Sequence, residues 1–271
     1  MIVQVKRLRA FVYYSLFLYF ILTSFSGGDD KFPIPPFKFK TIVIDAGHGG
    51  KDPGASGAYS CEKDVALAVA KKLQLLLKRD MGDVNVIMTR TTDKFIELNK
   101  RSEIANENQA NLFISIHCNS TPAENANSAK GVMLLVYGYH RKEEQMEALR
   151  ENASIYIEKD YKKNYAGYNE KDPASLIVLN AFMQKYRKQS ILFGQLLDRE
   201  FVVNDIRKSH GVKEQGVLVL AHSAMPAVLV ETGYINNAKE EKYLNSKNGQ
   251  DAIASSIFRA IKEYRGEIKT E

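Results

Sequence analysis

Several residue types that mark particular protein classes are absent or scarce in this sequence. Its 271 residues include no tryptophan and only two cysteines. The lack of tryptophan disfavours the exposed-tryptophan platforms of many carbohydrate-binding modules, and two cysteines cannot build a disulfide scaffold. The excess of basic over acidic residues is small too. Without Lys6, Arg7 and Arg9 the 38 basic residues become 35 against 32 acidic ones, so the net charge of +6 falls to +3. This weak excess gives no argument for a nucleic-acid partner.

A long apolar run lies near the N-terminus, between Ala10 and Phe25, and follows these basic residues. Serines precede Gly27 at the two positions that signal peptidase reads, so residues 1–26 are predicted to be a cleaved signal peptide. The alternative is an uncleaved anchor, because the run is only slightly shorter than the ~20 residues that a membrane span needs. The protein is predicted to be exported, to the periplasm or the cell envelope, with no stable membrane insertion after cleavage.

The remaining chain has the composition of one folded domain. Hydrophobic residues make up 45% and charged residues 26%, which is ordinary for a globular protein. Residues 27–40 hold three of the seven prolines and are predicted to be a linker. No second linker and no internal repeat follows. We therefore predict one domain over residues 41–265, with a short tail at 266–271.

Apolar segments of this domain alternate between the periods of strands and helices. Strands are predicted at residues 41–45, 84–89, 112–116, 132–137, 217–220 and 227–230. Helices are predicted at residues 62–79, 97–109, 173–203 and 252–264. This alternation predicts an α/β fold, a mostly parallel twisted sheet with helices on both faces. In such sheets the chemistry gathers beyond the carboxyl ends of the strands.

Histidine and carboxylate side chains occur at those strand ends. His48 and His117 each follow a predicted strand, Glu231 ends another, and Glu62 opens the first long helix. Two histidines and one carboxylate make a catalytic zinc set, and a further carboxylate can act as the general base for a metal-activated water.

Each of these residues also has a structural interpretation. A lone histidine is often a turn or core residue, and Glu62 could complement a helix dipole. The Gly-His-Gly-Gly segment could be a phosphate loop, but it lacks the GxxxxGK[ST] spacing. Glu231 is harder to explain structurally, because a carboxylate that ends an apolar strand is costly unless it is paired or used.

Four segments together carry a family resemblance. They are IDAGHGGKDPGASG, CEKDVALAVAKKL, RSEIANENQANLFISIHCNS and MPAVLVETGYINN. In this order, over residues 41–264, they resemble the zinc-dependent N-acetylmuramoyl-L-alanine amidases of the cell-wall hydrolase type. The resemblance implies that His48, Glu62 and His117 bind one Zn²⁺ and that Glu231 is the catalytic carboxylate. It implies peptidoglycan as the substrate, cleaved between N-acetylmuramic acid and the L-alanine of the stem peptide.

One position departs from the pattern of the resembled family. Relatives often have Arg-Gly-Val-Lys before the strand of the catalytic glutamate, whereas this chain has His210 at the arginine position, followed by Gly-Val and Lys213. We expect Asn119, His210 and Lys213 to contact the substrate, and Arg207 could replace the missing arginine. A histidine would make such a contact weaker or dependent on pH.

A charged, tyrosine-rich insert at about residues 138–172 lies where some relatives carry a regulatory or substrate-binding segment. It could be a lid over the stem-peptide groove. It could be an inhibitory helix whose acid (Glu143, Glu144 or Glu147) fills the open position of the metal, or a neutral surface excursion.

The two cysteines, Cys61 and Cys118, each adjoin a predicted ligand. They could form one disulfide, remain buried thiols, or supply a thiolate ligand in place of Glu62.

Three other functions compete with that of an amidase. The first is a non-catalytic zinc-bearing module that binds peptidoglycan or activates another hydrolase; retention of Glu231 argues against it. The second is a carboxypeptidase or endopeptidase that cleaves within the stem peptide. The third is a structural envelope protein without metal. The sequence leaves open whether an activator protein is needed.

Overall fold

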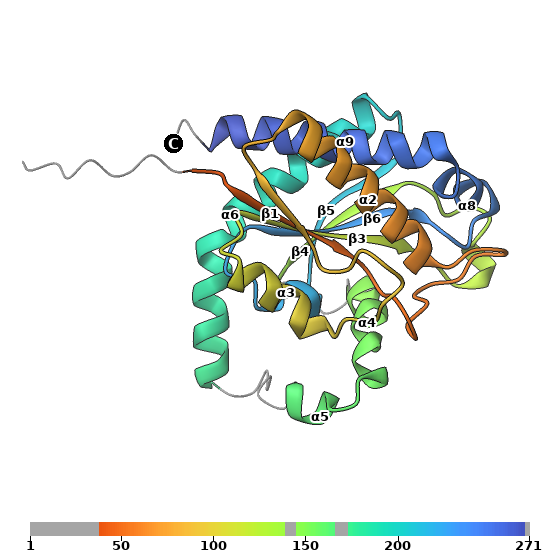
Figure 1. The fold of residues 1–271 in the computed structure, drawn as a ribbon. Helices are drawn as coiled ribbons and strands as arrows, with labels where there is room; N and C mark the ends of the chain where they lie inside the picture. Colours follow the sequence, from red (N-terminus) through yellow and green to blue (C-terminus); the bar gives the residue numbers. More distant parts are fainter. Residues whose placement is uncertain (1–37, 139–144, 166–172, 269–271) are drawn as a thin grey trace, which may run out of the picture. The chain divides into compact units, whose positions relative to one another are not determined.

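The computed structural model describes residues 38–138, 145–165 and 173–268. The predicted signal peptide and most of the predicted linker, up to residue 37, lie outside this range. Among the described residues, no helix combines the length and apolar character needed to cross a bilayer. The described chain is built around a six-stranded sheet (Figure 1) with the strand order β2-β1-β3-β6-β4-β5.

The sheet is parallel except at one pair of strands. Its strands are β1 (Thr41–Ala46), β2 (Asn85–Met88), β3 (Leu112–Asn119), β4 (Val132–Tyr137), β5 (Ser209–Gln215) and β6 (Ala227–Tyr234). Neighbours run parallel throughout, apart from the antiparallel pair β4 and β6. The carboxyl ends of β1, β3 and β6 therefore meet at one edge of the sheet.

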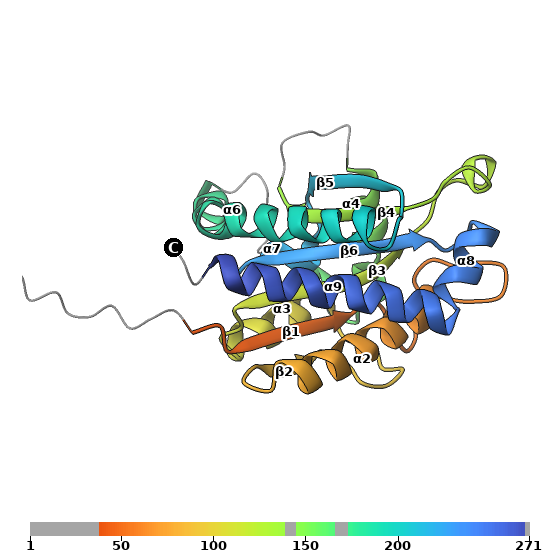
Figure 2. The same ribbon diagram turned by 90° about the horizontal axis from the view of Figure 1, so that it is seen from above.

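Helices cover both faces of this sheet. On one face lie α2 (Glu62–Asp80), α6 (Pro173–Val203) and α9 (Lys247–Glu267), and on the other α3 (Leu98–Glu107), α4 (Met146–Asn152) and α7 (Leu218–Ala221). Figures 1 and 2 show α9 and α2 together over the first face. Shorter elements are η1 (Ala123–Asn125), η3 (Ala153–Ile157), α5 (Tyr161–Asn164) and α8 (Ala238–Leu244). The predicted α/β class, with helices on both faces, is confirmed.

The alternation of side chains along β3 determines which of them point to each face of the sheet. All eight residues of β3 are buried, and alternate ones point to opposite faces. Leu112, Ile114 and Ile116 pack in the core beneath α2 and α9, whereas Phe113 packs in the core of the α3 face. His117 shares the parity of Phe113, so its side chain points to the face that α3, α4 and α7 cover.

One prediction of local structure is wrong, and one strand of the sheet was not predicted. The segment 217–220, predicted as a strand, is the start of the buried helix α7, because a short apolar run has no periodicity that separates the two states. Strand β5 was not predicted, since its sequence SHGVKEQ is polar and six of its seven residues are only half-buried. It is the last strand in the sheet order, and edge strands commonly carry charged side chains.

Candidate metal centre

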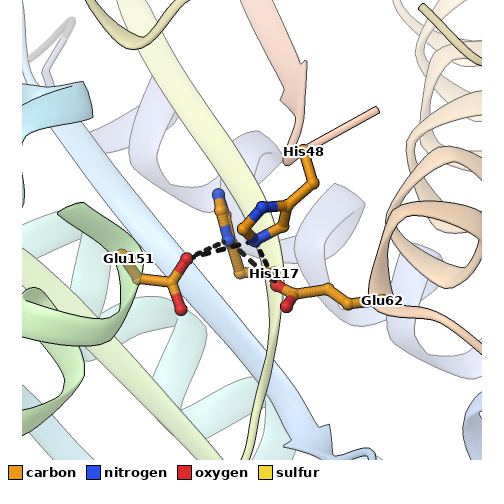
Figure 3. A group of neighbouring side chains, drawn as sticks. All are labelled: His48, Glu62, His117 and Glu151. Atoms are coloured by element: carbon orange, nitrogen blue, oxygen red, sulfur yellow. Dashed lines mark ion pairs between the residues drawn. The ribbon is translucent and has the colours of Figure 1, made fainter. Parts of the chain in front are cut away.

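Four buried side chains from four different segments converge at the edge formed by β1, β3 and β6. His48 follows β1, Glu62 opens α2, His117 lies near the end of β3, and Glu151 comes from α4. One ligand atom from each lies within 4.8 Å of every other. Figure 3 shows the four side chains pointing toward a common centre.

The distances and angles within this group suit a metal ion. Nε2 of His48 and Nδ1 of His117 lie 3.1 Å and 3.0 Å from Oε1 of Glu62, and 3.3 Å and 2.7 Å from Oε2 of Glu151. Despite these short distances, neither nitrogen has the alignment of a hydrogen bond to these oxygens. A tetrahedral ion with bonds of ~2.0 Å would separate its ligand atoms by about 3.3 Å. The four residues therefore could hold a metal ion.

Asp52 orients the first of these histidines. Its Oδ2 lies 2.8 Å from Nδ1 of His48, which leaves Nε2 facing the centre, as expected for a metal-bound histidine. Burial alone would raise the pKa of Asp52, but its hydrogen bond with His48 and the charge of that ring lower it to about 2. Asp52 also accepts a hydrogen bond of 2.7 Å from the hydroxyl of Ser154, which belongs to the predicted insert.

Glycines allow the segments of the site to approach one another. A Cβ at Gly47 would lie 2.4 Å from Nε2 of His117, and a Cβ at Gly54 would lie 2.6 Å from Oε2 of Glu62. Gly54 also has a φ of +65°, which favours glycine. The glycines around His48 thus serve close packing of the ligands, which explains them without a phosphate loop.

Two buried arginines hold the loop that carries His48. Arg101 donates hydrogen bonds of 2.9 Å to the carbonyls of Ala46 and His48, and Arg90 donates one of 2.7 Å to the carbonyl of Gly47. His48 itself has a φ of +57°, an unfavourable conformation for a residue with a side chain. The arginines satisfy the buried carbonyls of this loop and stabilise that conformation.

Removal of the Arg101 guanidinium is expected to destabilise the fold. Arg101 lies 2.8 Å from the buried carboxylate of Asp45, and this charge overcomes the effect of burial and lowers the pKa of Asp45. Arg101→Met should reduce the free energy of unfolding at pH 7 by about 3–5 kcal/mol, because it leaves a buried charge unpaired.

The loss should depend on pH in one direction. Because the folded-state pKa of Asp45 lies below its ordinary value of 3.8, the pair stabilises the fold above that value, and this contribution is lost as the pH falls through the folded-state pKa. Urea unfolding at pH 7 and pH 3 should therefore show a smaller difference between wild type and Arg101→Met at the lower pH. A difference that grows in acid would contradict this account.

Glu231 lies beside the ligand group on the neighbouring strand. It pairs in register with His117 across β3 and β6, and it is fully buried. Burial raises the pKa of Glu231 to about 8; Glu151 and Glu62 add to the rise, and Arg150 opposes it. One carboxylate oxygen lies 2.8 Å from Nη2 of Arg150. The site therefore has a buried carboxyl group next to the ligands, with a pKa above its ordinary value.

The acid that the insert brings to the ligands is Glu151, a residue that the sequence analysis did not single out. Of the three predicted acids, Glu147 instead accepts a hydrogen bond from Gln215, and Glu143 and Glu144 lie outside the described residues. Helix α4 exposes apolar side chains and buries an acidic one, the reverse of an ordinary surface helix: Met146 and Leu149 are about two-thirds exposed, whereas Glu151 is buried. An apolar stripe would have pointed to the wrong face, so periodicity could not find this residue.

The three residues expected to contact substrate occupy different places. Asn119 is buried two residues after His117, and its Oδ1 accepts a hydrogen bond from Arg150. The ring of His210 lies 5.8 Å from that of Tyr234, and Lys213 is half-buried in β5.

Arg207, which could replace the missing arginine, lies between Glu240 and Tyr243. Its guanidinium pairs with Glu240 at 2.8 Å and stacks on the ring of Tyr243 at 4.6 Å.

Both cysteines are free in the structure. Cys118 is buried with its sulfur 3.4 Å from the hydroxyl of Thr232, and its backbone N–H donates to Oε1 of Glu62. Glu62, and not a thiolate, therefore faces the ligand centre. Of the three interpretations of the cysteines, a buried thiol describes Cys118, whereas Cys61 is a half-buried free thiol.

Comparisons with known proteins agree on one family. The family model described as N-acetylmuramoyl-L-alanine amidase matches residues 42–263. The amidase AmiC of Escherichia coli is 32% identical over 227 residues, which are 82% of this chain and 52% of AmiC, so the chain spans about half the length of that relative.

Solved structures show the same likeness. An N-acetylmuramoyl-L-alanine amidase from Clostridium difficile 630 is 26% identical, with a TM-score of 0.62 over 84% of this chain and 97% of that chain. The CwlD amidase from Clostridioides difficile, solved in complex with the GerS lipoprotein, is 25% identical, with a TM-score of 0.61 over 84% of this chain and 99% of CwlD.

Proposed function

This chain belongs to the N-acetylmuramoyl-L-alanine amidase family of peptidoglycan hydrolases, and we propose that it cleaves the amide between N-acetylmuramic acid and L-alanine with a zinc-activated water. One observation carries the proposal: His48, Glu62 and His117 converge at one point while Glu231, which contributes no atom to that group, lies beside them. Hydrolytic zinc sites typically combine such a ligand set, two histidines and one carboxylate, with a further carboxylate that acts as acid and base.

In the proposed reaction the ligand residues bind the metal ion, and Glu231 transfers the proton. Zinc bound by His48, Glu62 and His117 would lower the pKa of its bound water to ~7 and polarise the amide carbonyl. Glu231 accepts the proton of the attacking water and delivers it to the departing nitrogen of L-alanine.

We propose that α4 holds this site in an inhibited state. Glu151 occupies the position next to both histidines that the attacking water needs, and Arg150 pairs with the carboxylate of Glu231.

The segment that carries α4 is anchored on both sides. Asn152 exchanges hydrogen bonds of 2.9 Å and 2.7 Å with the backbone of Gly216 and Leu218. On the other side Glu158 accepts one of 2.9 Å from the backbone of Leu98. This arrangement favours inhibition over a neutral excursion.

Opening of α4 is where an activator protein would act. The related CwlD amidase was solved in complex with a lipoprotein, which supports a protein partner for this chain as well. We further propose that the chain is exported to the cell envelope, as the apolar run before Gly27 predicts, since its substrate lies there.

Digestion of purified peptidoglycan, with mass spectrometry of the soluble products, tests the proposed activity. Wild type and Glu151→Ala should release peptides that begin with L-alanine, and a chelator or Glu231→Ala should abolish the release. Products trimmed inside the stem peptide would instead identify a carboxypeptidase or endopeptidase. Absence of any product from Glu151→Ala would favour a non-catalytic binding module.

A further inference from the structure

Three oxygen acceptors, two at the end of β3 and one within β6, surround the guanidinium of Arg150. Nη1 of Arg150 donates hydrogen bonds of 2.9 Å to Oδ1 of Asn119 and 2.9 Å to the carbonyl of Ser120, and Nη2 donates one of 2.8 Å to Oε1 of Glu231. We infer that these three acceptors form the subsite for the amine nitrogen of the leaving L-alanine. The inference rests on the proposed amidase function and assigns Asn119 and Ser120 a place in it.

The position of Asn119 suits a contact with the amide nitrogen, which is bonded directly to the reacting carbonyl carbon. It follows His117 by two residues on β3, so both side chains point to the same face of the sheet, and Glu231 pairs with His117 from β6. Asn119 and Glu231 are buried, and the acceptor Oε2 of Glu231 has no hydrogen-bond partner among the described residues. Buried polar atoms of this kind indicate a ligand that completes their bonding.

The chemistry of the reaction explains why acceptors gather here. The oxygen of water bonds to the carbonyl carbon, and the carbon–nitrogen bond breaks with its electron pair left on nitrogen. Glu231 passes one proton of water to that nitrogen, and the second proton of water, released when the new carboxylic acid ionises, completes the ammonium. The substrate amide has one N–H, whereas the alanine amine gains donors as it departs and becomes an ammonium with three. Acceptors on three sides therefore bind the departing nitrogen better than the amide, which favours bond cleavage.

The insert itself reproduces the charges of the two products. Hydrolysis yields a carboxylate on the lactyl side and an ammonium on the alanine side. Glu151 places a carboxylate oxygen 2.7 Å from Nδ1 of His117, and its neighbour Arg150 places a cation against Glu231. Adjacent residues of α4 thus fill the carboxylate position and the amine position together, as the reaction products would.

Binding of two small probes tests the subsite without reference to turnover. L-Alanyl-glycine carries the ammonium, and propanoyl-glycine is the same molecule without the amino group. Calorimetry on the full-length chain with Arg150→Ala should show at least about tenfold tighter binding of L-alanyl-glycine at pH 7, as charged hydrogen bonds imply. Wild type and Arg150→Lys, in which a cation still fills the subsite, should show no such preference.

Asn119 variants separate a direct contact from a structural role. In the Arg150→Ala chain, Asn119→Asp keeps an acceptor oxygen and should retain the preference, whereas Asn119→Leu, of similar size, should lose most of it. Equal affinity of the two probes in Arg150→Ala, or a preference that Asn119→Leu leaves unchanged, would overturn the subsite.

The subsite and the proposed function can fail separately. If Asn119→Leu does not fold, the comparison of Arg150→Ala with Arg150→Lys still decides the inference. Amidase activity without the ammonium preference would remove the subsite alone. The preference without amide cleavage would keep an amine-binding site and remove the proposed function.

Discussion

Replacement of Glu231 by glutamine should lower kcat by about 10²–10⁴-fold, the usual contribution of a positioned acid–base group. Glutamine has nearly the same shape but cannot accept the proton of water or return it to the leaving amine. The measurement is the rate of peptide release from peptidoglycan, made in the Glu151→Ala chain so that the insert does not limit turnover. Metal content should not change, because Glu231 contributes no atom to the ligand group.

A matched control for this substitution is Glu200→Gln. Glu200 is also a buried carboxylate, but it pairs with Arg259, at the packing of α6 against α9 on the opposite face of the sheet. Its loss should affect stability and not kcat. If Glu231→Gln retains more than about a tenth of the activity, Glu231 does not move the proton, since acid–base groups contribute more than this.

Replacement of Glu151 by alanine should raise kcat/KM by about 10- to 100-fold. The carboxylate forms ion pairs with both histidines of the ligand group, and a 10- to 100-fold change corresponds to the loss of about 1.4–2.8 kcal/mol of this attraction. Loss of these contacts shifts the population toward chains in which α4 has left the site. The measurement is the initial rate of peptide release at substrate concentrations well below KM.

Glu147→Ala provides the control, because Glu147 lies on the same helix and contacts Gln215 instead of the ligands. It should activate much less than Glu151→Ala. Equal rates for wild type and Glu151→Ala would contradict inhibition by the insert. A lower rate for Glu151→Ala would instead make α4 a lid that contributes to the reaction.

Arg150 and Glu151 block different parts of the same reaction. Glu151 faces the histidines, whereas Arg150 pairs with the proton-transferring carboxylate, and the two side chains contact each other at 3.1 Å. Because they are adjacent in α4, movement of one short helix uncovers both the ligand group and Glu231. A single partner that binds α4 could therefore release both blocks at once.

The elements with clear periodicity, and the residues at their ends, could be predicted from the sequence. Helix α2, strand β1 and strand β4 lie within one or two residues of their predicted ranges. The approximate positions of His48, His117 and Glu231 followed from local patterns, because each comes at or near the end of an apolar strand and parallel strands end at a common edge. Glu62 was found because it opens a helix with a strong apolar stripe.

Only the tertiary structure revealed what surrounds these residues. Arg101, Arg90 and Asp52 act through contacts with backbone and side chains that no spacing in the sequence encodes.

The sequence by itself indicated the family, through four segments in a fixed order, and the fold class, through local periodicity. It also suggested the candidate ligands, because they follow predicted strands or open a predicted helix. The tertiary structure alone decided the state of the site. Helix α4 turns apolar Leu149 to solvent and charged Glu151 inward, and a buried carboxylate is stable there only because histidines from other segments and the adjacent Arg150 surround it. Such compensation between distant parts of the chain has no local signature.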